Sequence, residues 1–155
     1  MFNQEEESFR LLAGRLDRLL AQALQHRVRD QGVQAGQLPV LLCLWDEDGL
    51  TQAELCRRVR VEQPTMANTL SRMVRDGLVA KTKDARDKRK THIRLTERGR
   101  DLQPLLTMSM EEVEEAAFEE FEAEERQALA ALMRRAVANL EADLAPPVVL
   151  VDVVE

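Results

Sequence analysis

Aromatic residues are scarce in this sequence. They make up only 3% of its 155 residues, and tyrosine is absent. Because hydrophobic residues still amount to 45%, the core must be built mainly from leucine, valine, alanine and methionine. The frequent Ala, Leu, Glu and Arg favour helix. This length suits one compact domain, or a small domain with dimerisation arms.

Long hydrophobic runs and a cysteine framework are also missing. No apolar run approaches the roughly 20 residues that span a bilayer, and the N-terminal MFNQEEESF is acidic where a signal peptide would be basic. We therefore expect a cytoplasmic protein without a membrane partner. Two cysteines, Cys43 and Cys56, are too few for a disulfide framework, which agrees with a reducing compartment. For both, core packing is favoured over a redox role.

Enzyme signatures are absent as well. The sequence has no nucleophile with a matched base, no glycine-rich phosphate loop and no metal-ligand spacing. His26 and His92 are too isolated to form a metal site within one chain, although a dimer could in principle assemble one. We expect no catalytic residue, no metal and no resident cofactor.

Positive charge is concentrated in one stretch. Residues 51–100 contain 14 Lys and Arg against 6 Asp and Glu, a local charge of +8 in a chain whose net charge is -6. The remaining residues therefore carry -14. A basic island in an acidic chain is typical of a nucleic-acid-binding module.

Two helices are predicted before this island. The first begins near Glu5 and carries one apolar stripe, made of Phe9, Leu12, Leu16, Leu19, Leu20, Ala23 and Leu24. The second runs from about Gly36 to Asp46, is apolar nearly all round, and has Pro39 in its first turn. Trp45 on this helix is assigned to the core, with the lining of an effector pocket as the alternative.

The island itself begins with a helix-turn-helix pattern. Thr51 and Glu54 form a capping box for a short helix. A second helix runs from about Gln63 to Asp76, with Pro64 in its first turn. One side of this helix is apolar, with Met66, Leu70, Met73 and Val74, and the other is polar, with Pro64, Thr65, Asn68, Arg72 and Arg75. Short polar and arginine side chains are what a helix in a DNA major groove presents.

A basic hairpin follows this pair of helices. Gly77 ends the helix, and residues 78–83 and 91–95 are predicted as two strands, with Ile93 and Leu95 facing inward. The loop between them, DARDKRK, has four cations and two carboxylates. A basic loop between two strands is the wing of a winged helix-turn-helix.

The C-terminal part is predicted as two long helices. Thr96 caps the first, which Pro104 kinks and which carries an apolar stripe of Leu102, Leu105, Leu106, Met110, Val113, Ala117 and Phe121. Nine glutamates in residues 111–125 indicate a solvated face, which would also keep this arm away from DNA phosphates. The last helix, about Ala123 to Asp143, has apolar residues at Leu129, Leu132, Met133, Ala136, Val137 and Leu140. Residues 148–154 have strand propensity without an obvious partner.

Several motifs together resemble the MarR/SlyA family of winged helix-turn-helix transcription regulators. They are AGQLPVLLCL, LTQAEL, EQPTMANTL, RDGLV and above all DARDKRKTHIRLTERG. The resemblance covers nearly the whole chain up to Leu144. It implies a mainly α (α+β) fold, with a winged helix-turn-helix lobe, a two-stranded wing and a helical dimerisation region made of the N- and C-terminal helices.

The resemblance also implies four regions and a partner. Residues 1–34 form an N-terminal dimerisation helix, 35–99 the DNA-binding lobe, 100–144 the C-terminal dimerisation helices, and 145–155 a tail of unknown structure. The expected function is a homodimeric, sequence-specific regulator of transcription, a repressor released by a small aromatic or phenolic effector. Its partner is a pseudo-palindromic operator in double-stranded DNA, with half-sites about one helical turn apart.

Site residues follow from the same resemblance. The helix from about Gln63 to Asp76, the recognition helix, places its polar residues in the major groove. The wing lays Arg86 into a minor groove, where Asp84 or Asp87 orients the guanidinium. Candidate phosphate contacts lie on the short helix that Thr51 caps, the scaffold helix, and at the end of the recognition helix. The full set is Gln63, Pro64, Thr65, Asn68, Thr69 and Arg72 for the recognition helix, Arg86, Lys88, Arg89 and Lys90 for the wing, and Thr51, Arg57, Arg58 and Arg75 for phosphates.

Asn68 departs from the family pattern, because close relatives place a base-reading arginine there. Asparagine prefers adenine, a contact worth roughly 1–3 kcal/mol of discrimination, so the operator should differ from theirs. The family's peroxide sensors use a cysteine on the first helix, and this chain has none there. Two alternatives to the regulator are a winged-helix module for protein–protein interaction and, less favoured, an enzyme.

Overall fold

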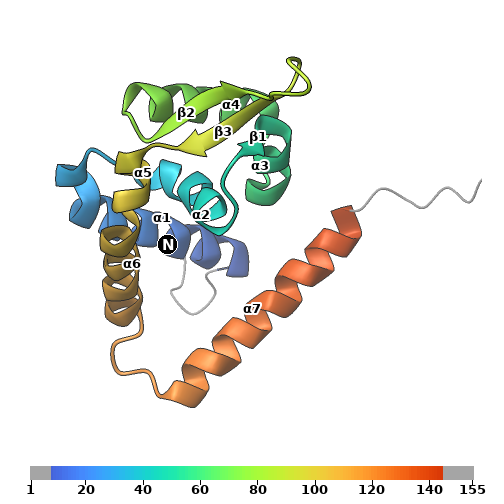
Figure 1. Cartoon of the computed structure of the whole chain (residues 1–155). Helices are drawn as coiled ribbons and strands as arrows, with labels where there is room; N and C mark the ends of the chain where they lie inside the picture. Colours follow the sequence, from blue (N-terminus) through green and yellow to red (C-terminus); the bar gives the residue numbers. More distant parts are fainter. Residues whose placement is uncertain (1–7, 145–155) are drawn as a thin grey trace, which may run out of the picture. The chain divides into compact units, whose positions relative to one another are not determined.

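The computed structural model describes residues 8–144 (Figure 1). Within this range the chain forms a helical protein with one small sheet, and it divides into two units, one ending at Ala117 and one beginning at Phe118. No helix among residues 8–144 is long and apolar enough to cross a membrane. The elements are α1 (Phe9–Val28), η2 (Arg29–Gln31), η3 (Ala35–Gln37), α2 (Leu38–Asp46), β1 (Leu50–Thr51), α3 (Gln52–Val59), α4 (Gln63–Arg75), β2 (Val79–Lys83), β3 (Thr91–Leu95), α5 (Glu97–Asp101), α6 (Gln103–Ala117) and α7 (Ala123–Leu144).

Helix α1 is capped by Ser8, whose Oγ accepts a hydrogen bond from the Leu11 amide. The predicted start near Glu5 lies outside the described residues. The predicted apolar stripe is buried only at its C-terminal end, where Leu24 packs into the core. Its N-terminal end is exposed, at Phe9, Leu12, Leu16 and Leu19. Half of this stripe therefore has no cover within the described chain.

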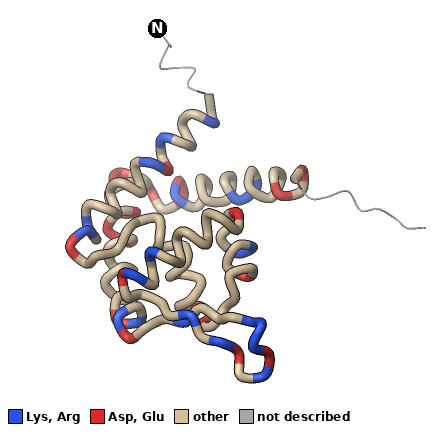
Figure 2. The backbone as a smooth tube through the Cα atoms, turned by 90° about the horizontal axis from the view of Figure 1, so that it is seen from above, with Lys and Arg blue, Asp and Glu red and all other residues tan. Residues whose placement is uncertain are grey.

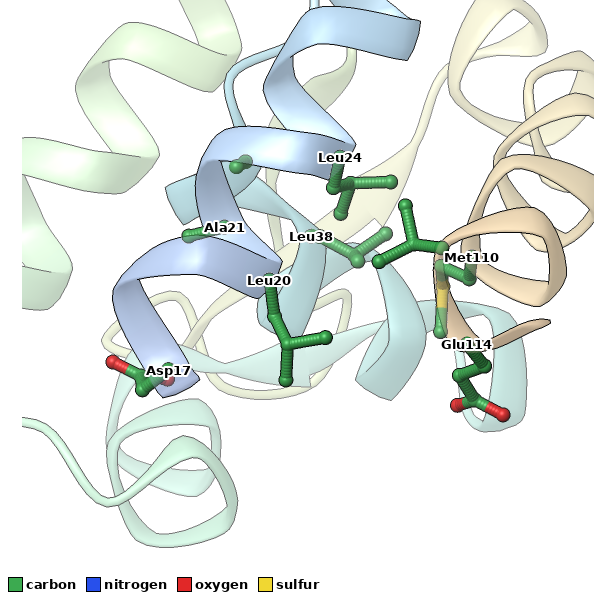
Figure 3. A pocket seen from close by; sticks show the side chains of 9 residues that line it. Asp17, Leu20, Ala21, Leu24, Leu38, Met110 and Glu114 are labelled. Carbon is green, nitrogen blue, oxygen red and sulfur yellow. The ribbon is translucent and has the colours of Figure 1, made fainter. Parts of the chain in front are cut away.

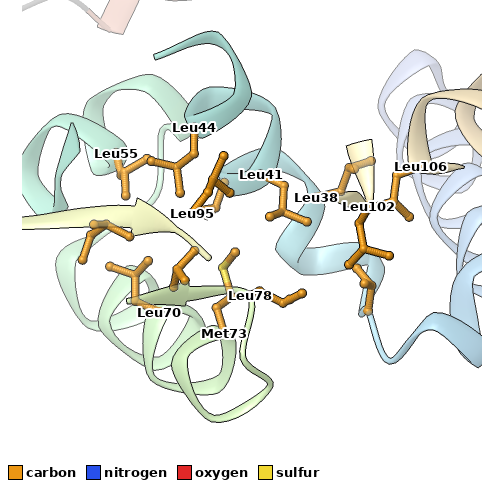
Figure 4. Close-up of a cluster of buried hydrophobic side chains, with 14 of the residues drawn as sticks. Leu38, Leu41, Leu44, Leu55, Leu70, Met73, Leu78, Leu95, Leu102 and Leu106 are labelled. Atoms are coloured by element: carbon orange, nitrogen blue, oxygen red, sulfur yellow. The ribbon is translucent and has the colours of Figure 1, made fainter. Parts of the chain in front are cut away.

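Helix α2 is at the centre of the first unit, between α1 and the layer formed by the sheet, α3 and α4 (Figure 1). Its side chains Val40, Leu41 and Leu44 are buried, and Figure 4 shows Leu41 and Leu44 among leucines that include Leu55 of α3, Leu70 of α4 and Leu95 of β3. Pro39 lies in the first turn as predicted. Although the helix is apolar nearly all round, as predicted, Leu42 is 41% exposed. The helix also begins two residues later than predicted, after the short turn η3.

The helix-turn-helix forms as predicted. The capping box of Thr51 and Glu54 begins α3, and Arg60 at φ 60° ends it. In α4, Met66, Leu70 and Met73 are completely buried. The prediction for Val74 was wrong, since this side chain is 41% exposed. At 3.6 residues per turn it lies about 70° from the mean direction of the other three, at the edge of the buried face.

The sheet contains the two predicted strands and one more. Strands β2 and β3 pair antiparallel, with Val79 opposite Leu95 and Lys83 opposite Thr91. The two-residue strand β1 adds to the other edge of β3, with Leu50 opposite Ile93, which gives the order β1-β3-β2. A strand of two residues is too short to show alternation, so the sequence contained no sign of it.

The predicted kinked helix after Thr96 is two helices. Helix α5 ends at Asp101, and α6 begins at Gln103, so Pro104 falls in the first turn of a new helix, where its missing N–H disrupts no hydrogen bond. The Thr96 cap is confirmed, because its Oγ accepts the Gly99 amide at 3.0 Å. Gly99 is required for close packing: a Cβ there would lie 2.2 Å from the backbone oxygen of Leu78.

The second unit consists of a turn and helix α7. In the turn, the rings of Phe118 and Phe121 pack edge to face at 5.5 Å, and Arg126 lies over Phe118. Phe121 was wrongly assigned to the stripe of the preceding helix, because α6 ends at Ala117. Within the described chain α7 has no buried residue. Its apolar side chains Leu132, Met133, Val137 and Leu140 are 46–59% exposed. The predicted strand at residues 148–154 lies outside the described residues.

Candidate nucleic-acid interface

The polar side of α4 is open to solvent. Every recognition-helix candidate is exposed except Thr69, which is half-buried and donates its hydroxyl proton to the backbone oxygen of Thr65 at 3.0 Å. Because Met66, Leu70 and Met73 are buried against the lobe, the orientation of the helix is determined by its core face. That packing presents Pro64, Thr65, Asn68 and Arg72 outward together.

A groove lies between the N-terminus of α3 and the start of β3. Its volume is about 550 Å³, and its lining includes Arg57, Gln63, Arg89 and Lys90. The structure therefore brings candidates from the scaffold helix, the recognition helix and the wing to one surface. Gln52 at its edge donates from Nε2 to Gln63 Oε1 at 2.8 Å, so the Gln63 side chain is held in place before any ligand binds. Gln52, the residue next to the Thr51 cap, was not among the predicted site residues.

The four candidate phosphate contacts are in different situations. Arg57 is exposed and lines this groove. The Thr51 hydroxyl is engaged in the capping box, which lowers the pKa of Glu54 through hydrogen bonds from the Thr51 amide and hydroxyl. Arg58 pairs with Glu47 and Asp46, and Arg75 pairs with Asp76 at 3.0 Å. Arg57 is thus the candidate whose charge is available at the groove.

The wing loop, residues 84–90, is organised by its two aspartates. Asp84 Oδ1 accepts the amides of Arg86 and Asp87, each at 2.8 Å, and Asp87 Oδ1 accepts the amide of Arg89 at 3.0 Å. In the described part of the chain both carboxylates thus bond backbone amides of the loop instead of the Arg86 guanidinium. Arg86, Lys88, Arg89 and Lys90 are all exposed. Figure 2 shows cations and carboxylates alternating along this projecting hairpin.

His92 lies at the base of the wing and was not predicted as part of the site. Its Nδ1 is 2.7 Å from the backbone oxygen of Gly49, and its Nε2 is 2.9 Å from Asp84 Oδ2. Hydrogen bonds from the loop amides and from His92 lower the pKa of Asp84 to about 2. The same carboxylate and the Gly49 carbonyl raise the pKa of His92. In the sequence, the only sign of a role for His92 was its position in a strand of alternating residues.

The C-terminal end of α4 is attached to the loop after α1. Gln37 is buried, and its Nε2 donates to Asp76 Oδ2 at 2.9 Å, which lowers the pKa of that carboxyl. Arg98 donates both to the backbone oxygen of Asp76 and, at 2.6 Å, to that of Gln31. These long-range bonds join α4 to η3 and α5.

A mostly apolar cavity of about 240 Å³ lies between α1, η3, α2 and α6. Figure 3 shows Leu20, Leu24, Leu38 and Met110 converging on it, with Asp17 and Glu114 at the periphery. Trp45 is not among its lining residues. The indole Nε1 of Trp45 donates to the backbone oxygen of Gly99 at 2.9 Å, which anchors α2 to α5.

Both cysteines are free thiols. Cys56 is buried in α3, and Cys43 is half-buried in α2. Burial raises the pKa of Cys43, which outweighs the opposite effect of Arg58. A raised pKa lowers the thiolate fraction, so this environment agrees with the predicted packing role.

The known proteins to which this chain is similar are regulators of transcription. A family model described as the MarR family matches residues 33–91. An uncharacterized HTH-type transcriptional regulator of Bacillus subtilis, YybA, is 27% identical over 130 residues, 84% of this chain and 87% of its own. The homoprotocatechuate degradative operon repressor of Escherichia coli is 29% identical over 111 residues, 72% of this chain and 75% of its own.

Solved structures agree in fold. The PcaV transcriptional regulator of Streptomyces coelicolor, in complex with its natural ligand, superposes with a TM-score of 0.77 and 26% identity, over 89% of this chain and 97% of its own. A MarR family regulator of Listeria monocytogenes, complexed with a 26mer DNA, has a TM-score of 0.79 and 20% identity, over 88% and 91%.

Proposed function

Because this chain belongs to the MarR family of transcriptional regulators, we propose that it binds a pseudo-palindromic operator as a homodimer and represses transcription until a small effector releases it. The observation that carries the proposal is the joint exposure of α4 and the wing on one lobe, within a stretch of charge +8. A structural neighbour with the same fold was solved with DNA.

Base reading is assigned to α4. Asn68 is exposed at the middle of the helix, and its amide matches the donor and acceptor pair of adenine in the major groove. Gln63, at the start of α4, is held by a hydrogen bond from Gln52 of α3. The wing adds Arg86 and neighbouring cations, which suit a narrow, strongly negative minor groove.

The homodimer is supported by apolar surface without cover. The exposed half of the α1 stripe and most of the apolar side of α7 would remain in water in a monomer, and amphipathic helices stabilise a fold by burying such a side. A two-fold axis would also duplicate α4, so that the two copies read two half-sites.

The effector is proposed to occupy the cavity beside α1 and α6. Its volume, about 240 Å³, is larger than the roughly 150 Å³ cavity known to hold benzene, so a single-ring compound fits. Asp17 and Glu114 at the periphery would accept a hydrogen bond from a phenolic hydroxyl and would disfavour a carboxylate nearby. A small phenol is therefore preferred to an aromatic acid.

A route for release is also available. Ala35 and Leu38 line the cavity, and Gln37 between them bonds Asp76 at the end of α4. An effector that displaces η3 would shift this bond and with it the recognition helix. Two relatives support a regulator that responds to a small molecule: one is named the homoprotocatechuate degradative operon repressor, and another was solved in complex with its natural ligand.

The test is titration of the purified protein against the DNA upstream of its coding region, at several salt concentrations, with a random duplex of equal length as control. A regulator should bind the upstream duplex about 1,000-fold or more tightly than the random one. A steep salt slope alone would indicate only phosphate binding. Equal affinity for both duplexes would contradict the proposal and favour a protein–protein interaction module.

A further inference from the structure

His92 has an acceptor at each ring nitrogen. On one side is the carbonyl oxygen of Gly49, at 2.7 Å from Nδ1, and on the other is the carboxylate of Asp84, at 2.9 Å from Nε2. A neutral imidazole carries one proton, so it can donate to only one of these oxygens and must turn a lone pair toward the other. Only the imidazolium satisfies both contacts. The geometry therefore selects the protonated ring.

The two acceptors belong to different parts of the lobe. Gly49 lies in the turn before β1 and α3, where its φ of 84° directs the chain into the Thr51 cap. Asp84 is the first residue of the wing loop, and its other carboxylate oxygen holds the amides of Arg86 and Asp87. The ring thus joins the scaffold of the helix-turn-helix to the residue that shapes the wing.

We infer that His92 is a positioning residue for DNA binding: as an imidazolium it holds the wing loop against the turn before α3, and its deprotonation releases the loop. The effect on DNA rests on the proposed function, because it is exerted through Arg86 and the other wing cations. The effect on the loop does not. Since His92 also lines the groove between α3 and the wing, deprotonation removes one positive charge from that surface.

The charges around the ring act on the pKa of His92 in both directions. Asp84 on the wing and Glu54 on α3 favour the imidazolium, and Arg94 on the same strand opposes it. Arg57 on α3 and Arg89 and Lys90 on the wing line the same groove and oppose it from further away. Hydrogen bonding to Asp84 and to the Gly49 carbonyl raises the pKa of His92 above its ordinary 6.5, so the carboxylate contact outweighs the cations.

The pH dependence follows from this sign. A group with a raised folded-state pKa contributes its full stabilisation below the unfolded-state value and loses it as the pH rises through the folded-state value. The wing is therefore fully held below about pH 6.5 and is released as the pH rises through the raised pKa of His92. Asp84, with a pKa of about 2, stays charged throughout this range.

The first experiment needs no DNA. The chain has two histidines, so the His26→Gln variant leaves a single ring to follow by NMR, and His26 is exposed on α1, far along the chain from the wing. We expect His92 to titrate above 6.5 and the backbone amides of Arg86 and Asp87 to shift with the same midpoint. Wing amides that do not respond while His92 titrates would overturn the inference.

The second experiment uses two variants at the pair itself. His92→Gln cannot be protonated, so its wing amides should show no transition over this range. Asp84→Asn keeps an oxygen for the loop amides but turns a donor toward His92, which a neutral ring can accept. It should therefore lower the pKa of His92 and preserve an ordered wing at high pH. If the wing loop lost its order at high pH in both variants, as in the parent, the inference would be overturned.

DNA binding is measured last, with the duplex upstream of the coding region. In the parent, affinity should fall about tenfold as His92 deprotonates, the effect of one charge-assisted hydrogen bond, and His92→Gln should be weak and independent of pH. Specific binding with no such midpoint would contradict the role of His92 in positioning. Absence of specific binding at any pH, together with a wing that follows His92, would instead contradict the proposed regulator alone.

Discussion

The winged lobe and helix α7 contain similar amphipathic patterns with opposite outcomes. In the lobe, α4 buries Met66, Leu70 and Met73 completely. In α7, an equally regular stripe that includes Leu132 and Val137 has no buried member in the described chain. A stripe in a sequence identifies the apolar face of a helix and does not identify what covers it. The lobe supplies its own cover, whereas the cover proposed for α7 is a second chain.

The largest expected effect is on the lobe core. Leu70→Ala leaves a cavity among fully buried side chains and should reduce the free energy of unfolding by about 2–5 kcal/mol. Chemical denaturation followed by circular dichroism measures this loss. The same change at Leu132, which is 59% exposed in the single chain, is the comparison, and it should lower stability only through the proposed dimer and so with a dependence on protein concentration. Equal losses at both sites, unaffected by protein concentration, would remove the distinction between the two regions.

Assembly should be most sensitive to α7. Leu132→Glu places a charge in the proposed interface twice, once per subunit, and should weaken dimerisation by about 3 kcal/mol or more, above a hundredfold in Kd. Sedimentation velocity over a range of concentrations measures it. Ala138→Glu, about a third of a turn around the helix axis from Leu132 and on the polar side, should leave the dimer intact. A parent protein that is monomeric at every concentration would refute the assignment of α7.

Specific DNA affinity should depend on the lobe surface without affecting its stability. Asn68→Ala removes a base contact from an exposed position and should weaken binding to the operator by about 1–3 kcal/mol, with little change for random duplex. Arg86→Ala should lower affinity for A·T-rich flanks. Fluorescence anisotropy at fixed salt measures the loss of affinity in each of the two variants. Asn68→Ala with unchanged operator affinity would show that α4 reads bases through other residues.

The smallest effect is expected at the helix cap. Thr51→Ala removes the hydroxyl that accepts the Glu54 amide and should lower the stability of the lobe by about 1 kcal/mol. Thr51→Ser keeps the hydroxyl and should restore most of that loss. Thermal unfolding of the three proteins in parallel tests this. An unchanged melting temperature in Thr51→Ala would show that the cap is dispensable once α3 is packed.

Local signals in the sequence predicted much of the fold. The capping box at Thr51, the glycine at the end of α4 and the alternation around Ile93 each correspond to an observed element. The predicted helix boundaries were less accurate where two physical effects compete. Pro104 was interpreted as a kink, but Leu102 is buried between α5 and α6, and packing favours a break with the proline in the first turn of α6.

The candidate site was predicted only in part. Residues of α4 and the wing could be named, because exposed polar and basic side chains follow directly from helical and strand periodicity. The sequence could not show which of these side chains already pair with other residues, since those partners are distant in sequence. Arg58 pairs with Glu47 of the preceding turn, and Trp45 bonds Gly99, 54 positions later.

The sequence by itself determined which faces are apolar, where helices are capped and where positive charge is concentrated, because these depend on neighbours a few residues apart. Only the tertiary structure decided that β1 joins the edge of β3, that Gln37 holds the end of α4, and that His92 meets Gly49 and Asp84. Each of these contacts joins segments whose separation along the chain carries no periodic signal. What these residues do depends on which partners the fold brings within hydrogen-bond distance, and the order of the residues along the chain does not show those partners.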